Sequence, residues 1–211
     1  MSFSKELKKE IFSFIQGPFH WLESWERKEY SLWDEFNYRD MFECDFRLCS
    51  GACKACILHP DFEGYVVKFC YDTDDDFDYC MREYTNYLAA VANGVEEFFA
   101  PVDYLGRIGR YRLFIQEEVM VDEDAVSSYW CDAVRNSRDY DYEDIDDVYD
   151  YINDMPDEER IAISFESEAL DKFCDEYVIN DVHEGNLGFI GDRLVIFDFS
   201  GYGAFVRNRG F

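Results

Sequence analysis

The segment from residue 179 to 200 constrains the fold of this chain more than any other. It reads INDVHEGNLGFIGDRLVIFDFS, and two short apolar runs flank Gly191-Asp192, a pair of residue types that closes tight hairpins. The second run, Val195-Ile196-Phe197, ends in Asp198. The pattern therefore predicts a β-hairpin whose second strand holds a carboxylate at its end.

Three polar side chains of this segment are of the types that phosphoryl transfer from a nucleotide requires. Asp181 is followed five residues later by Asn186, and Asp198 comes twelve residues after that. In such reactions one carboxylate orients the attacking hydroxyl, while an amide oxygen and a second carboxylate hold magnesium ions against the phosphates. The alternative is an ordinary turn, because Asp, Gly and Asn also gather there.

The order Asp-x-x-x-x-Asn, hairpin, apolar strand, Asp-Phe resembles the catalytic and metal-binding loops of the protein-kinase-like superfamily. With His183 inside the loop, it is similar to the loop of aminoglycoside and choline phosphotransferases and of the short kinase-like proteins of tailed bacteriophages. The resemblance implies that Asp181 orients or deprotonates the acceptor hydroxyl, that Asn186 and Asp198 hold Mg²⁺, and that His183 braces the loop.

Residues 42–69 alternate between short apolar runs and turn residues, which predicts three antiparallel strands near residues 46–48, 54–58 and 64–69. The third strand carries Lys68 near its end. In the resemblance, Lys68 takes the place of the lysine that contacts the α- and β-phosphates of ATP.

The turn between the first two of these strands contains Ser50, Gly51 and Ala52. The glycine-rich Gly-x-Gly-x-x-Gly pattern of protein kinases is missing from this turn. Small residues still let backbone amides approach phosphate oxygens, so the resemblance places the three residues in the cofactor-binding position.

A helix is expected next, starting with a capping pattern at Thr73 and Asp76 and ending at Asn93-Gly94. Glu83 lies in its middle, where the superfamily has a glutamate that pairs with the strand lysine. The resemblance therefore implies a Lys68–Glu83 ion pair. The alternative is a solvated glutamate beside Arg82.

Two further strands are predicted over Phe98–Val102 and Arg112–Gln116, connected through Gly106 and Gly109. The residues that follow, Glu117-Glu118-Val119, resemble the hinge between kinase lobes. The resemblance implies that backbone groups of Glu117 and Val119 pair with adenine.

Helices are predicted at both ends of the chain. Ser4 is positioned to cap a helix that Gly17-Pro18 would stop, within an N-terminal extension over residues 1–40. Apolar spacing predicts one helix over residues 121–134. A later helix, opened by Pro156, would lead directly to Asp181.

These expectations combine into an α+β chain with a minimal two-lobed, protein-kinase-like fold. Residues 1–40 form the helical extension, 41–119 the N-lobe with its antiparallel sheet, and 120–211 a truncated helical C-lobe with the catalytic and metal-binding loops. Only 13 residues follow Asp198, where the superfamily has an activation segment and further helices, and Ser200 replaces the glycine after Asp-Phe.

The net charge of −27 limits the partners that the chain is expected to bind. Nucleic-acid backbones and anionic lipid surfaces are disfavoured, because phosphate contacts require lysine and arginine. The acidic stretch over residues 139–151 is either a solvated surface or a docking site for a basic partner, including mimicry of a nucleic-acid backbone.

Eight cysteines, no apolar run of membrane-spanning length and no recognisable signal peptide favour a cytoplasmic protein with reduced thiols, in a bacterial or host-cell cytosol. The cysteines at 44, 49, 53 and 56 include a Cys-x-x-Cys pair, which suits a metal knuckle. Buried structural thiols are the preferred interpretation, because alternating strand side chains do not converge.

Two functions from different classes follow. The first is an ATP- and Mg²⁺-dependent phosphotransferase that acts on serine or threonine of itself or a host protein, as the resemblance to phage kinases implies. The second is a catalytically weak or inactive kinase-fold protein, a pseudokinase, whose acidic surface binds and inhibits a basic host factor. A small-molecule kinase is a further alternative, which only the His183-containing loop supports.

Overall fold

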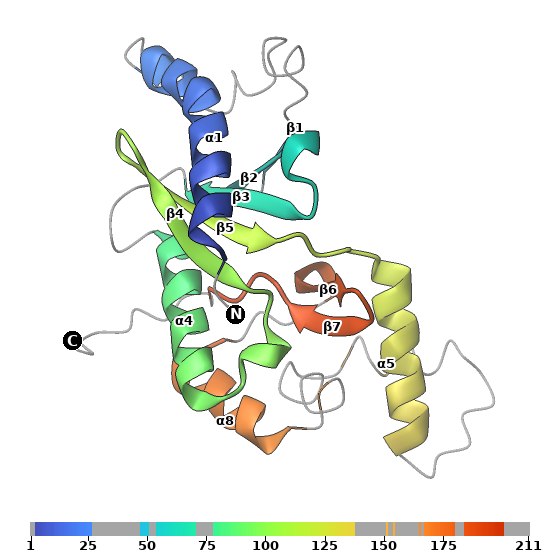
Figure 1. Cartoon of the computed structure of the whole chain (residues 1–211). Coiled ribbons are helices and arrows are strands. Elements are labelled where there is room, and N and C mark those ends of the chain that lie inside the picture. The colour runs from blue at the N-terminus through green and yellow to red at the C-terminus, as the bar shows by residue number, and fades with distance from the viewer. Residues whose placement is uncertain are drawn as a thin grey trace. The chain divides into compact units, whose positions relative to one another are not determined.

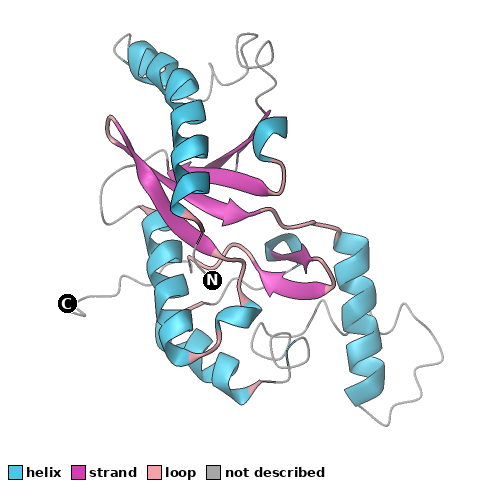
Figure 2. Ribbon diagram, viewed as in Figure 1, coloured by secondary structure: helices cyan, strands magenta, loops and turns pink. Residues whose placement is uncertain are grey.

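A computed structural model describes residues 3–26, 47–50, 54–70, 78–137, 167–179 and 184–200, and the single positions 151, 154 and 165. These residues form a mixed α+β structure with antiparallel sheets, which confirms the predicted fold class at this level (Figures 1 and 2). The chain divides into two compact units. Unit 1 contains residues 1–87 and 101–118, and unit 2 contains residues 88–100 and 119–211.

The elements follow one another in a simple order along the chain. The helices are α1 (Lys5–Glu26), α4 (Tyr79–Asn93), α5 (Glu123–Ser137) and α8 (Glu168–Tyr177), with short 3₁₀ helices η1 (Pro60–Phe62), η2 (Glu96–Phe98) and η3 (Glu184–Asn186). The strands are β1 (Arg47–Ser50), β2 (Lys54–Leu58), β3 (Tyr65–Cys70), β4 (Val102–Ile108), β5 (Tyr111–Glu117), β6 (Leu187–Ile190) and β7 (Arg193–Ile196).

The sheet of unit 1 has five antiparallel strands in the order β1-β2-β3-β5-β4. Its first three strands lie where the sequence predicted them. Successive side chains of a strand point to opposite faces. In β3, Val67 and Phe69 therefore point to one face of the sheet and Lys68 to the other.

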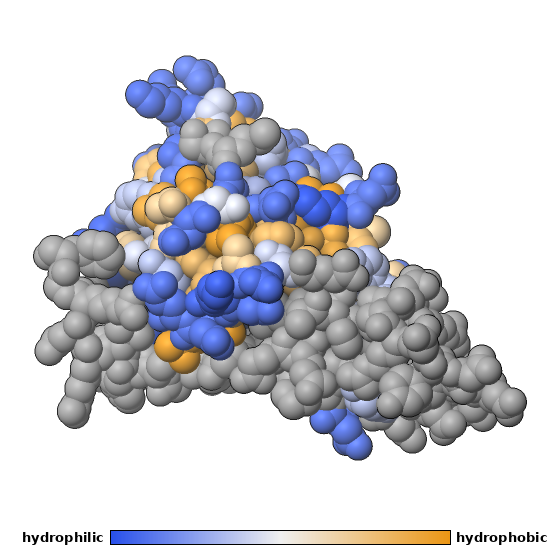
Figure 3. All heavy atoms as spheres, turned by 90° about the horizontal axis from the view of Figure 1, so that it is seen from below, coloured by the Kyte–Doolittle hydropathy of each residue, from blue (hydrophilic) through white to orange (hydrophobic). Residues whose placement is uncertain are grey.

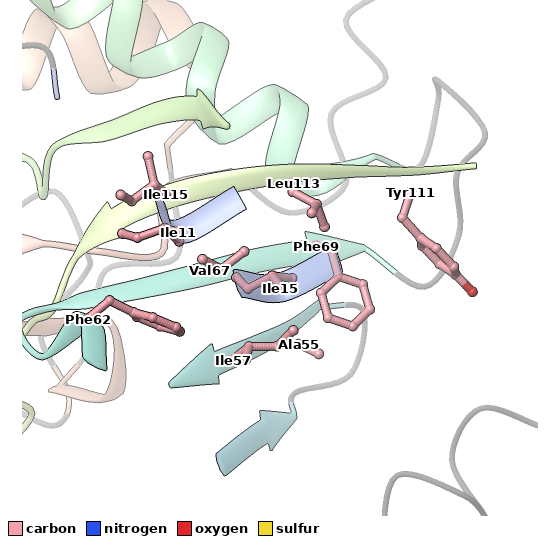
Figure 4. Packing of buried hydrophobic residues seen from close by; sticks show 10 residues of the cluster. All are labelled: Ile11, Ile15, Ala55, Ile57, Phe62, Val67, Phe69, Tyr111, Leu113 and Ile115. Atoms are coloured by element: carbon pink, nitrogen blue, oxygen red, sulfur yellow. The ribbon is translucent and has the colours of Figure 1, made fainter. Parts of the chain in front are cut away.

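Helix α1 covers the face of the sheet to which Val67 and Phe69 point. Ile11 and Ile15 of α1 pack in one buried cluster with apolar residues of β2, β3, β5 and η1, and Figure 4 shows them against these strands. The cluster consists of Ile11, Ile15, Ala55, Ile57, Phe62, Val67, Phe69, Tyr111, Leu113 and Ile115. This cluster therefore lies on one face of the sheet. The opposite face carries Lys68 together with buried Phe114, whose ring packs against Tyr84 of α4 and Tyr104 of β4.

The start of α1 agrees with the prediction, but its end does not. The Leu7 N–H donates to Ser4 Oγ at 3.1 Å, which is the expected cap. The expected stop at Gly17-Pro18 is wrong, because the helix continues to Glu26. A proline inside a helix removes one backbone hydrogen bond and its ring crowds the preceding turn, but it can kink the helix without ending it.

The strand predicted over Phe98–Val102 is also corrected. Residues 96–98 form η2, and β4 begins only at Val102. Phe99 instead belongs to the interior of unit 2, where its ring lies 4.8 Å from that of Phe199 and 5.6 Å from that of Phe173. An apolar run alone does not distinguish a strand from a buried connection.

Helix α4 begins later than the sequence suggested. Its cap is Asp78, whose Oδ1 accepts from the Met81 N–H at 2.9 Å. The predicted caps Thr73 and Asp76 lie outside the described residues. The helix ends at Asn93, as predicted, and Gly94 follows with a φ of +71°.

Unit 2 contains the predicted β6–β7 hairpin, with Gly191 at a φ of +61° in its two-residue turn. No helix in the described ranges is both long and apolar enough to cross a membrane. Hydrophobic and hydrophilic residues are interspersed over the described part of the face that Figure 3 presents.

Candidate functional site

The most prominent polar contact in unit 1 is the buried ion pair between Lys68 of β3 and Glu83 of α4. Lys68 Nζ lies 2.6 Å from Glu83 Oε1, and the two residues are 4% and 0% exposed. Burial of both charges is tolerated because each neutralises the other at short range. The pair that the resemblance implied is therefore present.

Two further residues of the sheet bind the same carboxylate. Lys54 Nζ lies 3.4 Å from Glu83 Oε2, and Gln116 Nε2 donates to Oε1 at 3.3 Å. Sequence reasoning missed both. Their positions follow from register, because Lys54 is opposite Cys70, Gln116 is opposite Val66, and these two residues share a face of β3 with Lys68. The sequence alone does not give this register, because it depends on which strands pair and in what alignment.

The N-terminal turn of α4 is fixed to the sheet by a second polar cluster. Asp78 Oδ2 accepts from Arg112 at 2.8 Å, and the Cys80 N–H donates to Cys70 Sγ at 3.2 Å. Burial raises the pKa of the Cys80 thiol well above its usual range, and the adjacent thiol of Cys70 raises it further. These contacts fix the position of α4 along the sheet, so that Glu83 lies beside Lys68.

The residues expected to contact the rest of a nucleotide are only partly described. Ser50 ends β1, and its side chain, like Gly51 and Ala52, lies outside the described part of the chain. Glu117 ends β5 in unit 1, where its N–H donates to the carbonyl of Pro101 at 3.1 Å. Val119 belongs to unit 2.

In unit 2 the backbone brings the two expected metal ligands to one end of the hairpin. The Phe197 N–H donates to the carbonyl of Asn186 at 3.0 Å, which extends the β6–β7 pairing by one step, and Asp198 is the next residue. Asn186 is 8% exposed and Asp198 is half-buried. Ser200 Oγ lies 3.4 Å from Asp198 Oδ1. The side chains of Asn186 and Asp198 offer amide and carboxylate oxygens, the ligand type that Mg²⁺ prefers.

The position of Asp181 is not described, and the same applies to His183. The structure does describe the chain that leads to them. Helix α8 ends at Tyr177, Val178 adopts a left-handed conformation, and the Ile179 N–H donates to the carbonyl of Cys174 at 2.9 Å. The predicted path to the loop is present up to Ile179, but α8 begins at Glu168 with Ser167 as its cap and not at Pro156, which lies outside the described residues.

The four-cysteine cluster can be examined only in part. Cys49 and Cys56 are register partners of β1 and β2, and Cys56 is half-buried. The side chains of Cys44, Cys49 and Cys53 lie outside the described residues. Their preferred interpretation as structural thiols therefore stays a prediction.

The expected site residues are divided between the two units. Unit 1 presents Lys68, held by Glu83, and unit 2 presents Asn186 and Asp198. A comparison with protein-family models finds no match, and a search of curated proteins also finds none. The case for a function therefore depends on the chemistry of these residues.

Proposed function

We propose that this protein is an ATP- and Mg²⁺-dependent phosphotransferase with a minimal two-lobed, kinase-like fold. The observation that carries the proposal is the buried Lys68–Glu83 pair, with 2.6 Å between Nζ and Oε1. A charge pair in the interior is rarely justified by stability alone, because the desolvation of both ions offsets their attraction. A fixed ammonium group is, however, well suited to bind the α- and β-phosphates of ATP.

Lys68 and Lys54 together give this part of the protein a local positive character. Both lysines contact the single carboxylate of Glu83, at 2.6 and 3.4 Å. The chain as a whole carries a net charge of −27, which would repel a nucleotide. A nucleotide site in so acidic a protein requires such a concentration of cations.

The hairpin of unit 2 supports the metal-binding half of the proposal. Asn186 and Asp198 would hold Mg²⁺, since the Phe197–Asn186 hydrogen bond keeps their backbones adjacent. When bound, the ion would offset the negative charge that develops on the transferred phosphoryl group. Asp181 would orient the acceptor hydroxyl. The proposed acceptor is a serine or threonine of the protein itself or of a host protein.

A second function is favoured by the acidity of the chain. A net charge of −27 suits a catalytically weak kinase-fold protein that binds a basic partner and inhibits it. Binding would then fall steeply with salt and would not require ATP or Mg²⁺. The two proposals differ in whether Asp198 and Lys68 are needed.

The decisive experiment measures transfer of labelled γ-phosphate to the protein itself and to extracts of candidate host cells. Lys68→Met, Asp198→Asn and Asp181→Ala are each expected to lower transfer by about a hundredfold or more, because they remove groups that act in the transition state. Removal of Mg²⁺ with a chelator should abolish transfer. Asp192→Asn is the matched control, because Asp192 is an exposed acid in the turn of the same hairpin.

The outcome separates the two functions. Transfer that depends on Asp198 but not on Asp192 supports the phosphotransferase. Equal behaviour of wild type and all variants, with salt-sensitive binding of a basic partner retained, would overturn it in favour of the binding protein.

A further inference from the structure

A second candidate metal site lies beside the Lys68–Glu83 pair and is independent of the proposed phosphotransferase. It consists of Cys70 at the end of β3, Asp78 at the cap of α4 and Cys80 in the first turn of α4. One ligand atom from each residue lies within 4.8 Å of the others, and all three residues are buried, at 4%, 5% and 1% exposure. We propose that this cluster binds a thiophilic divalent metal ion, Zn²⁺ in particular.

The ligand types select this class of metal. Two sulfurs favour Zn²⁺ over Mg²⁺ or Ca²⁺, which prefer oxygen ligands. In tetrahedral zinc sites, metal–ligand distances of about 2.0–2.3 Å place neighbouring ligand atoms roughly 3.5 Å apart. The present separations therefore require only a small contraction of the side chains. A water molecule would complete the four ligands.

The surroundings already orient the ligands as a metal site requires. Asp78 Oδ1 accepts from the Met81 N–H at 2.9 Å and Oδ2 accepts from Arg112 at 2.8 Å. Each carboxylate oxygen still has a lone pair for a metal. The Cys80 N–H donates to Cys70 Sγ at 3.2 Å, which fixes the position of that sulfur beside the first turn of α4.

The charges also balance. Without metal, two neutral thiols accompany the ion pair of Asp78 and Arg112. On binding Zn²⁺, both thiols release their protons to solvent, and the metal with two thiolates and one carboxylate carries one net negative charge. The guanidinium of Arg112 offsets that charge, so the buried cluster remains neutral.

The site has a structural consequence. Cys70 follows Lys68 by two residues on β3, and Cys80 precedes Glu83 by three residues on α4. A metal ion bound to both cysteines would fix the strand to the helix next to the ion pair. The proposed role is therefore to hold α4 against the sheet.

The test is a titration of the reduced, chelator-treated full-length chain with Co²⁺ and then Zn²⁺ in the absence of oxygen. We expect one equivalent to bind with thiolate-to-cobalt absorption. Cys70→Ser and Cys80→Ser should abolish this absorption, whereas Cys53→Ser and Cys174→Ser should retain it. Arg112→Gln should weaken zinc binding by about 10–100-fold, as loss of an outer-shell partner does. No binding at micromolar metal, or loss of binding only in Cys53→Ser, would overturn the proposal.

A second measurement uses only the wild-type chain, in case the serine variants do not fold. Alkylation at a fixed, moderate urea concentration is followed at each cysteine by peptide mass spectrometry. Zn²⁺ should slow alkylation of Cys70 and Cys80 and leave that of Cys131 unchanged. Equal rates with and without Zn²⁺ at Cys70 and Cys80 would also overturn the proposal.

Discussion

Lys68 Nζ lies 2.6 Å from Oε1 of Glu83. The carboxylate of Glu83 also accepts hydrogen bonds from Lys54 and Gln116, which lie on two other strands. One fully buried carboxylate thus joins α4 to three strands of the sheet. Its loss would leave two lysine ammonium groups without their common partner. The ion pair is therefore a structural element of unit 1, whatever its part in chemistry.

Replacement of Glu83 by glutamine tests this role. Breaking a buried ion pair by neutralising one partner destabilises proteins by about 3–5 kcal/mol, and Glu83→Gln should lower the free energy of unfolding by about this amount. Urea denaturation followed by circular dichroism measures it. Glu97→Gln, at an exposed position of η2, is the control and should change stability by less than about 0.5 kcal/mol. A similar stability for Glu83→Gln and wild type would contradict the assigned role.

The Lys68–Glu83 pair was expected from the resemblance to the protein-kinase-like superfamily. Local patterns placed Lys68 near the end of a strand and Glu83 in the middle of a helix, but they did not by themselves pair the two residues. Lys54 and Gln116 could not be predicted, because their contact with Glu83 depends on the register between strands that are distant in sequence. The same limit applies to Phe99, which the sequence assigned to a strand but which packs in unit 2.

The expected metal ligands in unit 2 follow a similar division. The hairpin around Gly191 was predictable from its turn residues, and with it the adjacency of Asn186 and Asp198. The role of Asp181 stays a prediction from the sequence. The continuation of α1 through Pro18 to Glu26 shows that a Gly-Pro pair does not by itself end a helix.

Substitution of Gly188, in β6, is expected to destabilise the protein. A Cβ atom at Gly188 would lie 2.6 Å from the carbonyl oxygen of Met120 and 2.5 Å from Val119 Cγ1. The backbone oxygen is held by the reciprocal hydrogen bonds of Met120 with Phe189, at 2.9 Å each, so it cannot easily move. Gly188→Ala should therefore destabilise the protein by about 1–3 kcal/mol.

Gly106→Ala provides the contrast for Gly188→Ala. The atoms nearest to its Cβ would all belong to the ring of Phe12, and a half-buried side chain can turn away. Urea midpoints of the two variants should differ, with Gly188→Ala the less stable. The reverse order would show that the approach of Met120 to β6 is not rigid.

Asp171 of α8 should give a stability that depends on pH. Its Oδ1 is buried and has no hydrogen-bond partner among the described residues. Burial raises the pKa of Asp171 above its usual 3.8, and the neighbouring Asp175 and Glu168 raise it further. The unfolded chain therefore releases this proton more readily than the folded one. The ionised carboxylate destabilises the fold at pH values above its folded pKa, and this effect disappears below pH 3.8.

Asp171→Asn should accordingly stabilise the protein at pH 7 and have progressively less effect as the pH falls toward 4. The gain should stay below about 1 kcal/mol, because solvent reaches much of this side chain and screens its interactions. Urea midpoints at both pH values measure it, with Asp192→Asn as an exposed control. A gain that increases on acidification would contradict the assigned cause.

Val178 lies in the segment that leads from α8 toward the loop that contains Asp181. It is the only non-glycine residue with a positive φ in the described part of the chain, at φ 56° and ψ 46°, and it ends α8. A β-branched residue in this conformation is strained by about 1–2 kcal/mol, while glycine adopts it freely. Val178→Gly should therefore stabilise the fold by about 0.5–1 kcal/mol after the greater entropy of unfolded glycine is deducted. Thermal unfolding should show a rise of a few degrees at most. Val178→Ala keeps the Cβ and should show no gain, so equal gains in both variants would show that the backbone conformation is not the cause.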